Sequence, residues 1–225
     1  DQWSPDHLAR AIDALEAGHD CFFGDHLQLA QTVGAFGRGG KIRAADHPAI
    51  GSHRGLHAYR GDMLDQIIRG NVIGTSTVVY AFKHLADHRF RTEFTSAGED
   101  YLFWMGIADR AARFAFSDAV EATYGRGVNV YSGAGWGAEE HLLRVHNELR
   151  YKKTIGPLFK VTPAQREYID AGIRQLREAF ARDLLHRLMH GRAAPVRLLG
   201  AHLVLDPMSY VMLPATATRV LAKRA

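Results

Sequence analysis

Hydrophobic and polar residues follow two patterns along this chain, one typical of helices and the other of strands. Apolar side chains recur at helical spacing in some segments, whereas short β-branched or aromatic runs occur in others. These patterns predict helices at residues 5–17, 62–69, 100–112, 138–153 and 163–190, and strands at residues 19–23, 72–82, 113–116 and 120–124. Because the two kinds alternate up to residue 124, the sequence predicts an α/β layer there.

The first predicted helix has clear start and stop signals. Ser4 can cap it and Gly18 can end it. Leu8, Ile12 and Leu15 recur on one face of this helix. By contrast, residues 24–61 are rich in glycine and histidine, so an irregular segment is predicted there.

The C-terminal third changes character. Thr162 and Gln165 form a capping box, with Pro163 at the first helical position. A long apolar stripe follows, which we expect to pack against the helix at residues 138–153. Its members are Ile169, Ile173, Leu176, Phe180, Leu184 and Leu188.

The tail at residues 195–225 is apolar and has few charges before Arg219. It can pack on the rest of the chain, or it can lie on a bilayer surface beside Arg192 and Arg197. The sequence leaves both alternatives open.

Composition narrows the class of protein. The chain has 225 residues, of which 47% are hydrophobic and 23% charged, as in ordinary globular proteins. Its one cysteine, Cys21, excludes an intramolecular disulfide and suits a reducing compartment. The net charge of +4 admits an anionic partner, but the basic clusters at residues 38–43 and 150–153 lack the interleaved aromatics of nucleic-acid readers. We therefore expect no nucleic-acid partner.

Two adjacent carboxylates, Glu99 and Asp100, stand where the helix at residues 100–112 begins. The helix dipole favours negative charge at this position, so an acidic helix cap is one interpretation. The other interpretation is that these carboxylates carry chemistry, and it depends on the rest of the chain.

Three segments resemble family 2 glycosyltransferases of the GT-A fold. Residues 1–8 (Asp-Gln-Trp-Ser-Pro-Asp-His-Leu) resemble the segment that follows the family's acidic metal cluster. Residues 71–79 (Asn-Val-Ile-Gly-Thr-Ser-Thr-Val-Val) are similar to the strand that borders the acceptor site. Residues 98–104 (Gly-Glu-Asp-Tyr-Leu-Phe-Trp) look like the family's Glu-Asp motif. The resemblance extends over residues 1–150.

The resemblance implies the C-terminal part of a GT-A-type, Rossmann-like mixed sheet with flanking helices at residues 1–155. Residues 156–225 would then be a helical C-terminal extension. In the family, the nucleotide-gripping Asp-Asp-Gly-Ser segment and most of the metal cluster come before the position that Asp1 matches. The chain would therefore correspond to the C-terminal two-thirds of such an enzyme, and could be inactive by itself.

The implied reaction is inverting transfer of a sugar from a nucleotide-sugar donor to a glycan, polysaccharide or other hydroxyl acceptor. Asp100 would be the catalytic base that takes the acceptor's proton, and Glu99 would orient the acceptor or shape the local electrostatic field. Mn²⁺ or Mg²⁺ would stabilise the leaving diphosphate, with Asp1 as one metal ligand. Thr75 and Trp3 would lie beside the donor or the acceptor.

A glycine-rich loop at residues 125–137 is the remaining candidate element. In similar enzymes a loop at this place closes over the donor, so Arg126, Asn129 and Trp136 are implied to bind donor or acceptor. The alternative is a surface loop with a buried tryptophan.

A competing hypothesis comes from a different class of function. The chain could be a catalytically incomplete fragment that only binds a partner or a membrane surface. Either hypothesis suits a cytoplasmic protein, and the tail would place it at the inner face of the membrane if it associates peripherally.

Overall fold

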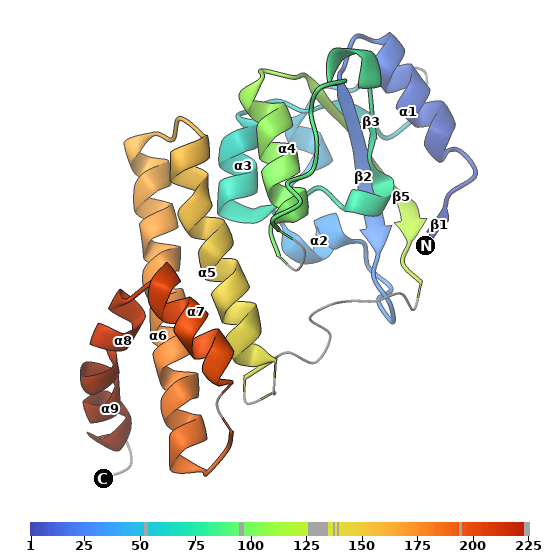
Figure 1. The fold of residues 1–225 in the computed structure, drawn as a ribbon. Helices are drawn as coiled ribbons and strands as arrows, with labels where there is room; N and C mark the ends of the chain where they lie inside the picture. Colours follow the sequence, from blue (N-terminus) through green and yellow to red (C-terminus); the bar gives the residue numbers. More distant parts are fainter. Residues whose placement is uncertain are drawn as a thin grey trace. The chain divides into compact units, whose positions relative to one another are not determined.

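The structure is a computed structural model, and it describes residues 1–51, 54–94, 97–125, 135, 136, 138, 140–193 and 195–222 (Figure 1). It divides the chain into two units. The α/β unit comprises Asp1–Arg91 and Asp100–Val128, and the helical unit comprises Thr92–Glu99 and Asn129–Ala225. The helix that begins near residue 140 belongs to the helical unit, whereas the sequence analysis placed the boundary after residue 155.

A five-stranded sheet forms the centre of the α/β unit. Its order is β1-β5-β2-β4, and β3 pairs with the same edge of β5 as β1 does. The β2–β5 pair is parallel and the other pairs are antiparallel, so the sheet is mixed. The predicted α/β class is therefore confirmed. The strands are β1 (Gln2–Trp3), β2 (Cys21–Leu27), β3 (Leu56–Ala58), β4 (Val79–Tyr80) and β5 (Phe114–Thr123).

Helices cover both faces of this sheet (Figure 1). On one face, Phe22 of β2 packs against Ala11 and Ala14 of α1. On the other face, the ring of Phe23 lies 5.8 Å from that of Phe116 and 6.0 Å from that of Phe36. The helices are α1 (His7–Glu16), α2 (Ala35–Gly39), α3 (Met63–Gly70) and α4 (Glu99–Asp109), with single 3₁₀ turns at Ala44–Asp46, Thr75–Thr77 and Phe82–His84.

The fully buried side chains of α1 are not its large apolar ones. Leu8 and Ile12 are half exposed, whereas His7, Ala11 and Ala14 are fully buried. The reason is steric, because the small alanine side chains let the helix approach the sheet closely. Leu8 and Ile12, two of the three large apolar residues that recur on one face of α1, are turned outward, and Leu15 is partly buried.

The strand predicted over residues 72–82 is mostly wrong. Only Val79–Tyr80 is a strand, and Thr75–Thr77 forms a 3₁₀ turn. Thr77 explains the difference, since its hydroxyl accepts a hydrogen bond from Gly24 N at 3.0 Å and donates one to Gly74 O at 2.7 Å. Side-chain bonds of this kind replace the backbone ladder that a strand would need.

Residues 24–61 are more regular than predicted. They contain the end of β2, all of α2 and all of β3. The two strands predicted at residues 113–116 and 120–124 are one strand, β5. The register between β2 and β5 shifts on both sides of Asp25, which accounts for the interrupted pattern in the sequence.

A buried carboxylate joins α1 to β5. The side chain of Glu121 is fully buried and accepts hydrogen bonds from Ser4 Oγ at 2.7 Å and Arg10 Nη1 at 2.9 Å, while His7 Nδ1 lies 3.5 Å away. Burial alone would raise the pKa of Glu121, but the contacts with His7, Ser117, Ser4 and Arg10 outweigh it and lower the pKa to about 2. The ionised carboxylate of Glu121 therefore stabilises the folded protein.

This shift predicts acid sensitivity. Because the folded pKa of Glu121 lies below its ordinary value of 4.5, its contribution is complete above about pH 4.5 and is lost as the pH falls toward about 2. We expect Glu121→Gln to remove roughly 3 kcal/mol of this acid-dependent stability. Denaturant unfolding over a pH series measures it, and Asp118→Asn, at a more exposed carboxylate of β5, is the control. Equal pH profiles for wild type and Glu121→Gln would contradict the assignment.

The helical unit is built on two long helices, α5 and α6. Thr162 Oγ1 accepts from Gln165 N at 3.2 Å, and Gln165 Oε1 accepts from Thr162 N at 2.8 Å, so the predicted capping box is confirmed. Leu142 and Val145 of α5 pack against Phe180 and Leu184 of α6, as expected. The helices of this unit are α5 (His141–Leu158), α6 (Pro163–Met189), α7 (Val196–Leu205), α8 (Met208–Val211) and α9 (Leu213–Ala222).

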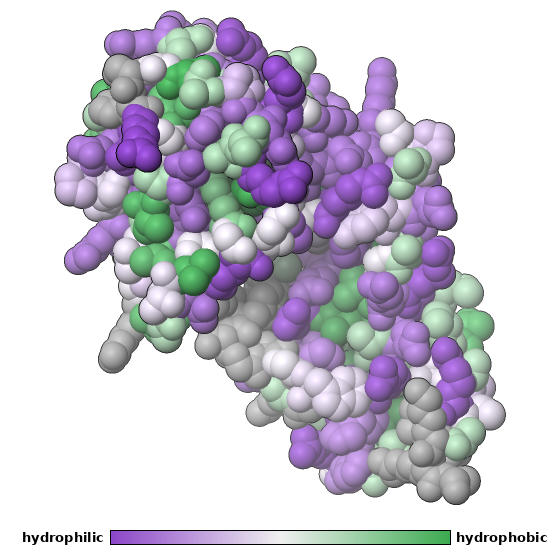
Figure 2. All heavy atoms as spheres, turned by 180° about the vertical axis from the view of Figure 1, so that it is seen from behind, coloured by the Kyte–Doolittle hydropathy of each residue, from purple (hydrophilic) through white to green (hydrophobic). Residues whose placement is uncertain are grey.

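The predicted stripe on α6 is buried along most of its length. Ile169, Ile173, Phe180 and Leu184 are buried, but Leu188 is 63% exposed. The tail packs on the same core through residues that include Leu198, Tyr210 and Leu213. On the face shown in Figure 2, hydrophilic residues predominate and hydrophobic residues form separate groups.

Candidate functional site

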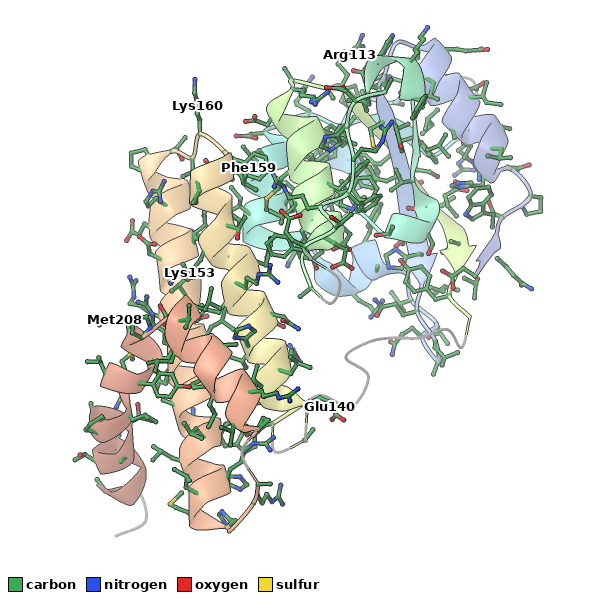
Figure 3. All side chains as sticks on the ribbon, viewed as in Figure 1. Arg113, Glu140, Lys153, Phe159, Lys160 and Met208 are labelled. Carbon is green, nitrogen blue, oxygen red and sulfur yellow. The ribbon has the colours of Figure 1, made fainter. Side chains whose placement is uncertain are left out.

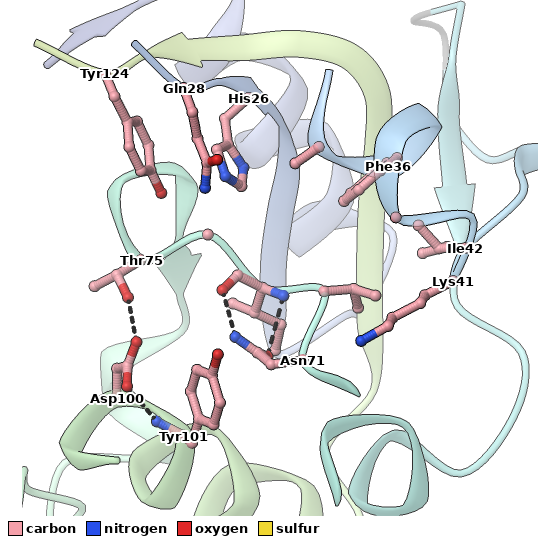
Figure 4. A pocket seen from close by; sticks show the side chains of 15 residues that line it. His26, Gln28, Phe36, Lys41, Ile42, Asn71, Thr75, Asp100, Tyr101 and Tyr124 are labelled. Carbon is pink, nitrogen blue, oxygen red and sulfur yellow. Dashed lines mark hydrogen bonds between the residues drawn. The ribbon is translucent and has the colours of Figure 1, made fainter. Parts of the chain in front are cut away.

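A cavity of about 310 Å³ lies in the α/β unit, beyond the carboxyl end of β2 (Figure 4). Segments far apart in the sequence form its walls: the end of β2, α2, the chain after α3, the start of α4 and the end of β5. Its volume falls in the range of small-molecule sites. Lining residues with polar or aromatic side chains are His26, Gln28, Phe36, Lys41, Asn71, Thr75, Asp100, Tyr101 and Tyr124.

The irregular end of β2 shapes one wall. The register shifts around Asp25 break the simple pairing with β5 just before His26, and such irregularities redirect side chains. Asp25 Oδ1 then accepts hydrogen bonds from His26 N at 2.8 Å and from Phe36 N at 2.9 Å. This carboxylate therefore fixes both His26 and the start of α2 at the cavity.

The chain after α3 forms a second wall. Asn71 folds back on its own backbone, donating to Ile73 O at 2.8 Å and accepting from Ile73 N at 3.1 Å. Gly74 follows, and a Cβ there would lie 2.5 Å from His26 Nδ1 and 3.0 Å from the Tyr124 hydroxyl. Only glycine permits this close approach of the backbone to both rings.

Asp100 lies beside the second wall, in the first turn of α4. Its Oδ1 accepts from Tyr101 N at 2.8 Å, and its Oδ2 lies 3.3 Å from the hydroxyl of Thr75, which donates to it (Figure 4). The side chain is half-buried, and the helix N-terminus favours its negative charge. The arrangement presents a carboxylate to the cavity in a position suited to proton transfer.

Uncharged hydrogen-bonding groups face this carboxylate across the cavity. The rings of His26 and Tyr124 are stacked, with centroids 4.6 Å apart. Burial lowers the pKa of His26, despite the nearby Asp25 carboxylate, and burial raises the pKa of Tyr124. At neutral pH the imidazole is therefore neutral and the phenol keeps its proton. Stacked rings with neutral polar tips suit a ligand rich in hydroxyl groups.

The N-terminal segment meets the same region. Asp1 Oδ1 accepts from Gly125 N at 2.9 Å, and its Oδ2 accepts from the hydroxyl of Ser76. Trp3 Nε1 donates to Ser76 O at 2.6 Å. Since Ser76 follows Thr75, which contacts Asp100, the three segments that resemble the glycosyltransferase motifs are joined by hydrogen bonds.

The described residues do not complete a metal site. Within the described ranges, no group of three or more histidine, cysteine, aspartate or glutamate side chains is placed to hold an ion. Both oxygens of Asp1 accept hydrogen bonds, and its carboxylate is the single predicted ligand. Asp1 as a ligand of Mn²⁺ or Mg²⁺ stays a prediction, and we derive no reaction step through a metal.

The other predicted site residues are distributed differently. Glu99 is the first residue of α4 and is not part of the described cavity lining. Trp136 is 52% exposed, and its described contacts are with His141, His186 and Arg182 of the helical unit. Arg126 and Asn129 lie outside the described residues.

Several lining residues were not predicted. His26, Gln28, Phe36 and Lys41 lie in or beside the segment that was expected to be irregular. Tyr124 ends the last predicted strand, directly before the glycine-rich loop, and that position could have marked it. The other lining residues are brought to the cavity by contacts between segments that are distant in the chain. A single sequence does not show such contacts.

Comparisons of the chain with protein-family models, with curated proteins and with solved structures found no match.

Proposed function

We propose that this protein is a GT-A-type, family 2-like glycosyltransferase that moves a sugar from a nucleotide-sugar donor to a hydroxyl acceptor, with inversion at the anomeric carbon. The acceptor would be a glycan, a polysaccharide or another hydroxyl compound. The α/β unit would carry the reaction, and the helical unit would be a C-terminal extension of it.

One observation carries the proposal. Two of the three segments quoted for the resemblance line one cavity and are joined by the hydrogen bond between Thr75 and Asp100, and the third is bonded to the adjacent Ser76 through Asp1 and Trp3. A chance likeness of three short motifs gives no reason for them to meet in space. The cavity also joins a carboxylate to aromatic rings with neutral polar tips, which is a suitable surface for a sugar.

The transfer needs a base that takes the proton of the acceptor hydroxyl, and Asp100 would be this base. An acceptor hydroxyl that binds beside Asp100 Oδ2 gives up its proton to this carboxylate as its oxygen attacks the anomeric carbon. The bond from that carbon to the diphosphate oxygen breaks, and the nucleoside diphosphate leaves with the electron pair. A single displacement of this kind inverts the anomeric carbon.

Neighbouring residues would orient the two substrates. Tyr124 can donate a hydrogen bond to a sugar oxygen because burial keeps its phenol protonated. Lys41 contributes the positive charge of the described cavity lining, and it could pair with an anionic group of a substrate. Phe36 and Tyr101 add apolar surface against a sugar face.

The test is a transfer assay with the protein expressed from its complete gene. A panel of UDP-, GDP- and dTDP-sugars is supplied with simple glycosides and Mn²⁺ or Mg²⁺, and release of nucleoside diphosphate is measured. We expect acceptor-dependent release with one class of donor, and NMR of the product should show the inverted anomer.

Two results would contradict the proposal. A product with retained configuration would exclude the single displacement. Absence of acceptor-dependent release, together with no saturation transfer from the protein to any nucleotide sugar or glycoside in NMR, would favour the non-catalytic binding module.

A further inference from the structure

Helices α7 and α8 have an inverted distribution of polar and apolar side chains. The side chains that α7 and α8 bury completely include His202 and Ser209, and Asp206 between the helices is 1% exposed. Their exposed side chains include Val196 at 80%, Val204 at 88% and Val211 at 66%. A surface helix in water shows the opposite arrangement.

Specific contacts hold the polar side chains inside. Asp206 accepts both hydrogen bonds of the Arg177 guanidinium fork, at 2.7 and 2.8 Å, and one from Lys153 Nζ at 3.1 Å. Figure 3 labels Lys153 of α5 and Met208 of α8. The Ser209 hydroxyl donates to Asp206 Oδ2 at 2.8 Å and lies 3.0 Å from His202 Nε2. These bonds fix which face of α7 and α8 is turned inward.

The ring of His202 completes the inner face. It is stacked on Phe180 at 3.6 Å, and its Nδ1 lies 3.1 Å from His146 Nδ1. Burial and the nearby His146 lower the pKa of His202 to about 4, so the ring is neutral near pH 7. The polar side chains of the inner face are therefore hydrogen-bonded and packed inside the unit. Their contacts determine the orientation of α7 and α8, and this orientation exposes the valines.

The exposed charges in the sequence around the outer face are arginines. Between residues 193 and 218 the ionised side chains at neutral pH are Arg197 and the buried Asp206. Arg192 precedes this stretch, whereas Arg219, which follows it, is paired with Glu178 of α6 at 3.4 Å. The outer face thus combines exposed aliphatic side chains with positive charge.

Length and composition limit what this face can do. In the described part of the chain, no single helix is long and apolar enough to cross a membrane. The segments Val196–Leu205 and Met208–Arg219 reach the required hydropathy only together, and they are bent by 104°. This geometry suits a pair that lies along a surface with its apolar side inserted.

We propose that the outer face of α7 and α8, with Val196, Leu203, Val204, Met208 and Val211, binds the surface of a bilayer that contains anionic lipids. Val and Leu side chains at these positions would enter the boundary between headgroups and acyl chains, and Arg192 and Arg197 would contact lipid phosphates. A symmetric dimer through this face is less favourable, because it would bring the arginines of two copies together. The proposal is independent of the glycosyltransferase function.

The experiment is co-sedimentation of the full chain with vesicles of phosphatidylcholine, with and without phosphatidylglycerol. We expect binding to the anionic vesicles, and weaker binding at high salt because surface charges are screened. The double variant Val196→Asp/Val204→Asp should bind at least about tenfold more weakly, since it places charge in the apolar face. Val33→Asp is the matched control, because Val33 is a 54% exposed valine of the α/β unit.

The double variant should melt like the wild type, since both valines are exposed. The proposal would be overturned if the double variant bound anionic vesicles as well as Val33→Asp does. It would also be overturned if the wild type bound no vesicles. If the wild type ignores vesicles but forms a dimer in light scattering that the double variant abolishes, the face binds a second copy instead.

Discussion

Replacing Asp100 by asparagine is expected to lower kcat by at least about 100-fold in the proposed transfer reaction. The amide is nearly isosteric: its oxygen can still accept from Tyr101 N, and its Nδ2 can donate to the Thr75 hydroxyl, so the start of α4 should stay in place. What it loses is the ability to take the acceptor's proton. Steady-state kinetics should show a reduced kcat with little change in the KM for the donor.

The matched control is Asp109→Asn, at the exposed C-terminal end of the same helix. It makes the same chemical change away from the cavity, and its kcat should equal that of the wild type. If Asp100 is only a helix cap, Asp100→Asn will change the melting temperature while kcat stays within a factor of about three. That result would remove Asp100 as the base.

Local signals explain the parts of the fold that the sequence predicted well. The capping box of Thr162 and Gln165 determines where α6 begins, and the side chain of Asp62 caps α3 by accepting from Asp65 N at 3.0 Å. In each of these caps, the two residues that form the hydrogen bond are three positions apart in the chain. The elements they start were therefore visible without knowledge of the rest of the structure.

The cavity depended on contacts between distant segments. Asp100 and Thr75 were named because they lie in motifs, and their hydrogen bond brings the two motifs together. His26 lies in β2 and Tyr124 directly follows β5, and the parallel pairing of β2 with β5 brings their rings into contact. The register shifts beside this contact are visible in the sequence only as the interruption between the two strands predicted for β5, and that interruption does not show where β2 pairs.

Hydrophobic periodicity identified the buried stripe of α6 over most of its length but not the buried side chains of α1. In α1 the sheet selects small residues, Ala11 and Ala14, and Leu8 is left exposed. In α7 the inner face is determined by His202 and its hydrogen bonds, and Val204 is left exposed. In both helices close approach or polar bonding determines burial, and periodicity measures neither.

Replacing Phe180 by aspartate is expected to destabilise the helical unit by several kcal/mol. Phe180 is fully buried between α5 and the tail, and its ring is stacked on His202 at 3.6 Å. The change removes an aromatic ring from the core, a loss of about 3–5 kcal/mol for truncations of this kind, and leaves a carboxylate without a cationic partner. Denaturant unfolding followed by circular dichroism measures the effect.

Leu188→Asp is the control on the same helix, because Leu188 belongs to the predicted stripe but is 63% exposed. It should cost less than about 1 kcal/mol, mainly from an acidic residue near the helix C-terminus. Equal and large losses for both variants would mean that the stripe is buried along its whole length. If Phe180→Asp unfolds like the wild type and only its binding to anionic vesicles is reduced, Phe180 faces the membrane and the packing of α6 on α5 described above is wrong.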